Sequence, residues 1–446
     1  MRISVIGLGK LGSPMAACFA AKGFTTIGVD LNETYVDAIN EGKAPVFEPR
    51  LAEMLAEGRA CLTATTDIAA AVASADATFL IVPTPSDEAG GFALDYVLSA
   101  CEAIGHVLRD KAGYHLVVLT STVMPGATGG PVREALEEAS GKRVGDEIGL
   151  CYSPEFIALG SVIRDFLNPD FLLIGESDPR AGEMLADIYR RVVDNDPPIA
   201  RLNFVNAELA KISVNTFVTT KIAFANMLAR ICERLPEADV DQVTSALGLD
   251  SRIGAKYLRG AISYGGPCFP RDNLALASLA RSLDAPAFVA EATDVANRDG
   301  IERLAQAAID HLPAHGTVGV LGLAYKPGTN VVEESPGLNL VRTLAARGIE
   351  VTAFDPAAVA NAQAELDGAN VNFAASVEDL VRRSDVVVIA TAWQEFANIG
   401  PSLLQLEGKR RVVIDCWRLL DGDRVQEVAE YVPLGQTMRT HTGSRA

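Results

Sequence analysis

Near its N-terminus the chain reads Arg2-Ile-Ser-Val-Ile-Gly7-Leu8-Gly9-Lys10-Leu11-Gly12, with a β-forming run before three glycines and a helical pattern after them. In the spacing G-x-G-x-x-G, the first glycine permits a tight turn and the second lets backbone approach a pyrophosphate. The third allows the helix to pack closely on the strand. The helix N-terminus would then present free N–H groups to the phosphates. The stretch predicts a dinucleotide-binding β-α unit, although G-x-G-x-x-G alone is weak evidence.

Asp30 strengthens this interpretation. It follows the second predicted strand, residues 25–29, and stands eighteen residues after Gly12. A carboxylate there can accept hydrogen bonds from ribose hydroxyls and would repel a 2′-phosphate. We therefore predict NAD, and not NADP, as the cofactor, bound by Gly7, Leu8, Gly9, Lys10, Leu11, Gly12 and Asp30.

Strand and helix patterns alternate at both ends of the chain. The predicted strands are residues 2–6, 25–29, 78–82, 116–120 and 149–152, and later 317–321, 350–354, 386–390 and 411–415. Such alternation is typical of a parallel sheet with helices on both faces. We predict an α/β protein in which two Rossmann-like parallel-sheet domains are joined by a long central helix and a helical dimerisation region.

The middle of the chain is predicted to be helical. One uninterrupted segment, residues 206–235, has six apolar residues that we expect in the core: Leu209, Ile212, Phe217, Phe224, Leu228 and Ile231. The domain prediction is a cofactor domain at 1–200, a helical domain at 201–312, a second Rossmann-like domain at 313–435 and a tail at 436–446.

Length and composition exclude several classes of protein. The 446 residues suffice for two or three domains, and the net charge of −18 disfavours nucleic acid or an anionic membrane as a partner. No apolar run approaches the roughly 20 residues of a membrane span, and no signal-peptide pattern is present, so we expect a cytoplasmic protein. Seven dispersed cysteines without a C-x-x-C pair argue against a metal site or a disulfide framework.

Two further motifs stand at predicted strand ends. Pro83 and Thr84 follow one strand, and Thr122 follows the next in Thr120-Ser-Thr122. Ligands of open α/β sheets bind outside the carboxyl ends of the strands, so these residues are candidate cofactor contacts. A helix cap is an equally good interpretation of Thr122.

Cys268 lies in Tyr264-Gly-Gly-Pro-Cys268-Phe-Pro-Arg-Asp272, a stretch too rich in Gly and Pro for a helix interior or a central strand. Small backbone at such a place lets a substrate approach a nucleophilic thiol. The alternative is that Cys268 is a small packing residue, because most lone cysteines are buried in a core.

Three polar residues complete a candidate reaction centre. Glu155 follows a predicted strand, and Lys211 and Asn215 share one face of the long helix. For the last two, an ordinary surface pair is the alternative. A thiol and a hydride acceptor can oxidise an aldehyde through a thiohemiacetal to a thioester. Lys211 and Asn215 could stabilise the oxyanions and Glu155 could activate water.

Over residues 1–425 the chain resembles the UDP-glucose/GDP-mannose dehydrogenases. The resemblance rests on the glycine turn, Val82-Pro-Thr-Pro85, Ser121-Thr122, Pro154-Glu-Phe156, Lys211-x-x-x-Asn215, Gly265-Gly-x-Cys-Phe-Pro-x-Asp272 and Tyr325-Lys326-Pro327. It implies oxidation of the C6 alcohol of a nucleotide sugar to a carboxylate, with two NAD and one enzyme cysteine.

The resemblance also implies the role of each residue. Cys268 is the nucleophile, with Lys211, Asn215 and Asp272 around the reacting carbon, while Glu155 is the hydrolytic base and Thr122 holds the water. It implies cofactor contacts at Pro83, Thr84, Thr122, Glu155 and Arg271, and substrate contacts at Glu155, Phe156, Lys211, Asn215, Tyr257, Tyr264, Gly265, Cys268, Tyr325 and Lys326. It further implies a homodimer built on the long helix, with Arg252 entering the partner's substrate site.

Four departures from the family pattern bear on the sugar. Leu159 stands in place of a second carboxylate, Arg271 in place of a lysine, Glu333 in place of an arginine, and Trp417 in place of the arginine of Asp-Gly-Arg. UDP-glucose is the leading prediction, with UDP-N-acetylhexosamine and GDP-mannose as alternatives. A catalytically silent NAD-binding protein and a two-electron alcohol dehydrogenase are the rival classes.

Overall fold

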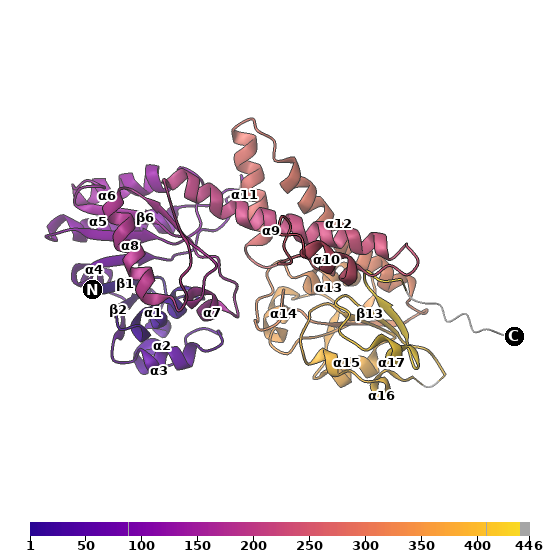
Figure 1. Cartoon of the computed structure of the whole chain (residues 1–446). Helices are drawn as coiled ribbons and strands as arrows, with labels where there is room; N and C mark the ends of the chain where they lie inside the picture. Colours follow the sequence, from indigo (N-terminus) through magenta and orange to yellow (C-terminus); the bar gives the residue numbers. More distant parts are fainter. Residues whose placement is uncertain (88, 407, 438–446) are drawn as a thin grey trace. The chain divides into compact units, whose positions relative to one another are not determined.

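The computed structural model describes residues 1–87, 89–406 and 408–437. The chain divides into two compact units, Met1–Val214 and Asn215–Ala446 (Figure 1). The predicted boundaries at 200 and 312 stay a prediction. Most of the predicted tail lies outside the described residues, but its first two residues are paired: Gln436 bridges to Asp239, and the Thr437 amide donates to the Ala238 carbonyl at 3.2 Å.

The first unit, indigo to magenta in Figure 1, contains an eight-stranded sheet of order β3-β2-β1-β4-β5-β6-β7-β8. Its strands are β1 (Arg2–Ile6), β2 (Thr25–Val29), β3 (Leu62–Thr65), β4 (Ala77–Leu80), β5 (His115–Leu119), β6 (Ile148–Tyr152), β7 (Leu172–Glu176) and β8 (Ile199–Leu202). All neighbours pair in parallel except β6 and β7. The predicted parallel sheet is confirmed for six strands, with an antiparallel step to the last two.

Helices cover both faces of this sheet. They are α1 (Gly12–Ala21), α2 (Glu33–Glu41), α3 (Leu51–Glu57), α4 (Ile68–Ser74), α5 (Asp95–Asp110), η1 (Thr128–Val132), α6 (Arg133–Ser140), α7 (Val162–Leu167) and α8 (Pro179–Val192). In β5, Leu116 and Val118 pack in one core with α1, and Val117 and Leu119 pack in another with α5. A strand buried on both faces reads as a continuous apolar run, which is why β5 lacks polar alternation.

The long helix α9 (Phe204–Cys232) has 29 residues and runs through the boundary between the units. The predicted core positions on it are partly wrong. Ile212 is buried, but Leu209, Phe217, Phe224 and Ile231 are exposed, Phe217 to 67%. Apolar residues occur on several sides of this helix, so their spacing did not mark the side that packs within the chain.

The second unit begins with the rest of α9 and then α10 (Val240–Gly248), α11 (Phe269–Ser282) and α12 (Phe288–Asp310). Its sheet is entirely parallel, with the order β11-β10-β9-β12-β13-β14. The strands are β9 (Thr317–Leu321), β10 (Glu350–Phe354), β11 (Val371–Phe373), β12 (Val386–Ile389), β13 (Val412–Asp415) and β14 (Glu430–Pro433). The helices are α13 (Pro336–Ala346), α14 (Val359–Glu365), α15 (Val377–Arg383), η2 (Phe396–Asn398), α16 (Pro401–Leu404) and α17 (Gly422–Gln426).

Strand order reverses once in each sheet, between β1 and β4 and between β9 and β12. Such a reversal is where α/β sheets bind ligands. The predicted fold of two Rossmann-like sheets with a helical region is confirmed. Within the described residues, no helix is long and apolar enough to cross a membrane, and no group of side chains has the composition of a metal site.

Candidate functional site

The glycine turn after β1 is held by close backbone contacts. Gly7 has φ +95°, and a Cβ on it would overlap the carbonyl oxygen of Ile81. A Cβ on Gly12 would overlap the carbonyl oxygen of Gly7. Gly9 differs, because a Cβ there would meet no protein atom within 4 Å. Packing thus requires the outer two glycines, and the middle one leaves open space of the kind that a pyrophosphate needs.

The surroundings of the turn fit NAD. Helix α1 begins at Gly12 with no side chain capping its N-terminus and no acidic residue in its first turn. The Asp30 carboxylate is partly exposed and accepts hydrogen bonds from the Leu8 amide at 2.6 Å and the Asn32 amide at 2.9 Å. A carboxylate has about four acceptor sites, so it retains capacity for ribose hydroxyls.

The ends of β4 and β5 are joined by side chains. Ser121 Oγ accepts from the Val82 amide at 3.0 Å and donates to the Val82 carbonyl at 2.6 Å. Thr84 Oγ1 donates to the Thr122 carbonyl at 2.8 Å, and Pro83 beside it is exposed. The helix-cap interpretation of Thr122 is wrong, because the next helix, η1, begins only at Thr128.

Glu155 lies just past β6 in an environment that changes its acidity. Burial raises the pKa of Glu155 to about 7, against a hydrogen bond from Tyr189 and the charge of Lys211, which lower it. Tyr189 Oη donates to Glu155 Oε1 at 3.2 Å and bonds Ser153 Oγ at 2.8 Å. A carboxyl group with a pKa near neutrality is suited to general base catalysis.

Lys211 is buried, with 7% of its surface exposed. Its Nζ donates to the Glu155 carbonyl oxygen at 2.7 Å and lies 4.6 Å from the centre of the Phe156 ring. The surface-pair interpretation of Lys211 and Asn215 is therefore wrong for Lys211. Asn215, one turn further along α9, is partly buried.

Asn215 and Asp272 form a close polar pair in the second unit. Asn215 Nδ2 donates to Asp272 Oδ2 at 2.6 Å, and Asp272 is 1% exposed. The Asp272 amide donates to the Cys268 carbonyl at 2.8 Å in the first turn of α11. Arg271 is adjacent, with its Nε 3.5 Å from Asp272 Oδ1.

Cys268 is the N-cap residue of α11. Among the seven cysteines, all of them within the described residues, Cys268 is exposed, Cys61 is partly buried and the rest are buried. The interpretation of Cys268 as a packing residue is wrong. Pro270 is tolerated in the first turn of α11, where a helix needs no N–H, so the helix begins earlier than its Gly- and Pro-rich start suggests.

The glycines before Cys268 pack against the segment 325–334. A Cβ on Gly265 would overlap the Glu334 carbonyl oxygen, and one on Gly266, where φ is +88°, would lie 2.7 Å from the Tyr325 ring. Packing within the chain is thus sufficient reason for both glycines, independent of the predicted access for substrate. Lys326 Nζ lies 5.8 Å from the centre of the Tyr325 ring.

Two tyrosines flank Phe269. The Tyr257 and Tyr264 rings each make an edge contact with it, at 6.3 Å between centres. Tyr264 is buried and its Oη accepts from Asn273 Nδ2 at 2.9 Å, whereas Tyr257 is exposed. Tyr257 therefore has surface to offer a ligand, while Tyr264 contributes mainly to packing.

Arg252 and Arg418 differ in exposure and in the partners of their ion pairs. Arg252 is exposed and paired with Asp250, two residues earlier, at 2.6 Å. Arg418, next to Trp417, has a side chain that is 5% exposed and makes a bidentate ion pair with Asp241 at 2.6 and 2.8 Å. Arg418 stands one position after the place of the arginine in the family pattern Asp-Gly-Arg. Its ion pair with Asp241 links the loop after β13 to α10.

Sequence reasoning missed three residues near these positions: Tyr189, Glu48 and Glu208. Glu48 accepts from the amides of Gly160 and Val162, both at 2.8 Å, and so holds the loop after Glu155. Nothing local in the sequence marks that contact, which spans 112 residues to Gly160. Glu208 could have been noticed, because it stands three residues before Lys211 on the same side of α9.

Comparison with known proteins identifies the family. The UDP-glucose/GDP-mannose dehydrogenase family matches with its NAD binding domain at residues 1–193, its central domain at 205–299 and its UDP binding domain at 319–422. A UDP-glucose 6-dehydrogenase of Haloferax volcanii is 37% identical over 94% of this chain and 97% of that protein. A GDP-mannose 6-dehydrogenase of Pseudomonas savastanoi pv. phaseolicola is 35% identical over 93% and 95%.

A solved structure agrees with these sequence matches. A UDP-glucose dehydrogenase from the archaeon Pyrobaculum islandicum superposes with a TM-score of 0.88 and 34% identity, over 98% of each chain. The predicted resemblance, the NAD cofactor and the oxidoreductase class are confirmed. The chain belongs to the UDP-glucose/GDP-mannose dehydrogenase family and is an NAD-dependent oxidoreductase.

Proposed function

We propose that this protein oxidises the C6 hydroxymethyl group of a nucleotide sugar to a carboxylate through a covalent intermediate on Cys268, and that UDP-glucose is its substrate. The observation that carries the proposal is the exposed Cys268 at the start of α11, one turn from the buried Asp272 to which Asn215 donates a hydrogen bond. A two-electron alcohol dehydrogenase has no use for that thiol.

The proposed reaction has three stages. The C6 alcohol first loses a proton and a hydride and becomes an aldehyde. The Cys268 thiol then adds across the aldehyde C=O bond to give a thiohemiacetal, which loses a second hydride from carbon and the proton of its hydroxyl group and becomes a thioester. Water finally adds to the acyl carbon, the C–S bond breaks and the carboxylate is released. NAD, when bound at the glycine turn, accepts each hydride.

Each side chain has a role in this scheme. Lys211 and Asn215 stabilise the negative oxygen at the alkoxide and tetrahedral stages. Glu155 takes the proton of the attacking water, for which its pKa of about 7 suits it.

Pro83, Thr84 and Arg271 bind the cofactor, and Phe156, Tyr257, Tyr325 and Lys326 bind the substrate.

The choice of UDP-glucose has two supports. The relatives from Haloferax volcanii and Pyrobaculum islandicum are UDP-glucose dehydrogenases, and the C-terminal match is to a UDP binding domain. The GDP-mannose dehydrogenase of Pseudomonas savastanoi is nearly as similar, so GDP-mannose is the second candidate.

The test is NADH formation by purified protein with UDP-glucose, GDP-mannose, UDP-N-acetylglucosamine and UDP-N-acetylmannosamine. We expect the highest kcat/KM with UDP-glucose. A higher kcat/KM with any of the others would replace the proposed substrate, and no turnover with the whole panel would favour a catalytically silent NAD-binding protein.

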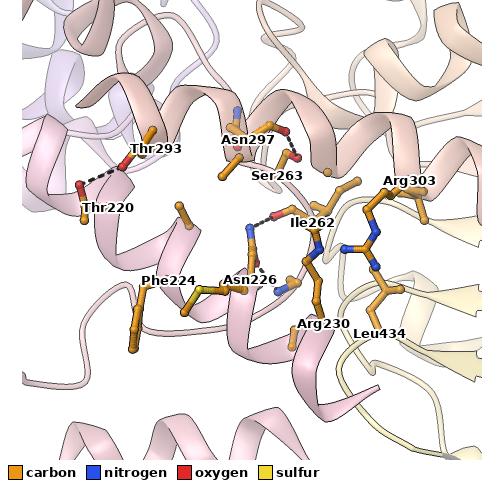
Figure 2. Close-up of a pocket in the computed structure, with 18 of the residues that line it drawn as sticks. Thr220, Phe224, Asn226, Arg230, Ile262, Ser263, Thr293, Asn297, Arg303 and Leu434 are labelled. Carbon is orange, nitrogen blue, oxygen red and sulfur yellow. Dashed lines mark hydrogen bonds between the residues drawn. The ribbon is translucent and has the colours of Figure 1, made fainter. Parts of the chain in front are cut away.

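We further propose that the protein is a homodimer that uses the outer face of α9. Phe217, Phe224 and Ile231 recur at seven-residue spacing and are exposed. A cavity of about 510 Å³ is lined by Phe224 of this face. Figure 2 shows Phe224 on its wall and Arg230 and Arg303 at one end. A seven-residue apolar repeat is typical of a helix that packs against another helix.

We propose that Arg252 enters the partner's substrate site, and the exposure of its side chain supports that role. Mixing inactive Arg252→Ala protomers with inactive Cys268→Ala protomers should therefore restore activity in heterodimers. No recovery despite demonstrated subunit exchange would contradict the shared site. Cytoplasmic localisation stays a prediction.

A further inference from the structure

Glu208, on α9, is 0% exposed, although the proposed reaction does not use it. Both carboxylate oxygens accept backbone hydrogen bonds: Oε2 from the Gly126 amide at 2.6 Å and Oε1 from the Thr128 amide at 2.7 Å. Burial raises the pKa of this carboxyl group, and hydrogen bonding by Thr128 and Gly126 lowers it. A carboxylate so deeply buried is costly unless donors compensate it, so the two amides account for its presence there.

The segment that Glu208 holds begins at Thr122, the residue proposed to hold the attacking water. At the start of the segment, Thr122 is tied to the end of β4 by the hydrogen bond from Thr84 Oγ1 to its carbonyl. At the end, Gly126 has φ +98° and Thr128 begins η1, and Glu208 binds the amide of each. Thr122 therefore lies between two anchors, one on the sheet and one on α9.

The same turn of α9 also holds the proposed base. Lys211 follows Glu208 by three residues, and its Nζ donates to the Glu155 carbonyl at 2.7 Å. One helical turn thus ties the Thr122 segment through Glu208 and the Glu155 segment through Lys211. Rigid secondary structure of this kind fixes catalytic groups more closely than loops can by themselves.

We propose that Glu208 is a positioning residue for thioester hydrolysis, holding the Thr122 segment at a fixed distance from Glu155. The inference rests on the proposed function, because it needs the covalent intermediate. In the step concerned, the water oxygen bonds to the acyl carbon and Glu155 takes a proton from that water. The C–S bond breaks, and its electron pair leaves with the Cys268 sulfur.

The test uses Glu208→Gln. The glutamine side chain has the shape of the glutamate, but it offers one acceptor oxygen and one donor NH₂ group to the Gly126 and Thr128 amides, which both need an acceptor. Thioester formation should proceed while hydrolysis slows. We expect a rapid release of two NADH per site, followed by turnover about 100-fold slower than in the wild type. Intact-protein mass spectrometry should show a uronyl-nucleotide adduct that requires Cys268. A folded variant that turns over at the wild-type rate, or that loses activity without forming the adduct, would overturn the proposal.

Two variants separate this inference from the proposed function. Glu155→Gln removes the base itself and should also accumulate the adduct. If it does and Glu208→Gln does not, the positioning role is wrong and the proposed function stands; if Glu155→Gln forms no adduct, the proposed function fails. Asp355→Asn is the matched control for losing a buried carboxylate that holds backbone amides, and it should lower stability without forming an adduct.

Gly126→Ala keeps the proposal testable if Glu208→Gln does not fold. Its Cβ would meet no atom within 4 Å, but alanine at φ +98° strains the end of the segment that Glu208 holds. We expect adduct accumulation in the same direction as for Glu208→Gln. Wild-type turnover without an adduct would contradict the proposal.

Discussion

Asp30 and Asp355 stand directly after the second strand of their respective sheets, β2 and β10, yet their surroundings differ. Asp30 is partly exposed and accepts two hydrogen bonds. Asp355 is buried and accepts five, from the amides of Leu323, Ala324, Ala357 and Ala358 and from Trp393 Nε1. A carboxylate has about four acceptor sites, so Asp355 has none left for a ribose. Of these two aspartates, Asp30 alone retains acceptor sites for the ribose of NAD.

The turns that follow β1 and β9 also differ between the two units, although the helix after each turn packs in the same way. In both units a Cβ on a glycine in the first turn of the helix, Gly12 or Gly337, would overlap the carbonyl of the glycine that follows the first strand, Gly7 or Gly322. The helix therefore packs on the strand in the same way. Four residues lie between the two glycines in the first unit and fourteen in the second, where the extra length carries Tyr325 and Lys326. Two sheets of one plan can thus serve different ligands.

We expect the largest effect on NAD affinity from a substitution in the glycine turn after β1. Gly12→Ala should weaken NAD binding by about 100-fold, because the added methyl group pushes α1 away from the Gly7 carbonyl. Gly337→Ala introduces the same overlap in the second unit, so it should lower stability and leave the NAD Kd within about twofold of the wild type. Fluorescence titration with NAD measures both. Equal losses of NAD affinity in the two variants would contradict the division between the sheets.

A smaller effect is expected at the two aspartates. Asp30→Asn should weaken NAD about 30-fold, the loss of roughly 2 kcal/mol of charge-assisted hydrogen bonding, and should improve the affinity for NADP relative to NAD. Asp355→Asn should instead cost about 2–3 kcal/mol of the free energy of unfolding. Competitive titration with both cofactors and denaturant unfolding test the pair. A Kd for NAD that is unchanged in Asp30→Asn would show that this carboxylate does not bind the ribose.

The smallest effect concerns pH. Glu155 follows β6 with its pKa raised to about 7, and the proposed base must be deprotonated to act. Where hydrolysis limits the rate, kcat should therefore rise with pH through about 7, roughly tenfold between pH 6 and pH 8. Asp415, at the end of β13, already accepts from the Leu419 and Leu420 amides and Tyr431 Oη. In Asp415→Asn, kcat should still rise with pH through about 7, and in Glu155→Gln this rise should be absent.

Local patterns explain how much could be predicted from the sequence. The glycine spacing and Asp30 predicted an NAD-binding domain at the N-terminus, which the family match confirms, because both act within one β-α-β unit. The antiparallel step between β6 and β7 could not be predicted, since strand direction there depends on pairing across the sheet. The contact of Glu208 with Thr128 spans 80 residues, and no local pattern encodes it. Whether Lys211 is buried likewise depends on what packs against α9, not on its spacing from Asn215.

The central claim, oxidation by four electrons through Cys268, is tested most directly by counting NADH against nucleotide sugar consumed. We expect two NADH and one carboxylate per UDP-glucose with the wild type, and no carboxylate with Cys268→Ala. One NADH per sugar with release of an aldehyde, or full carboxylate production by Cys268→Ala, would contradict it.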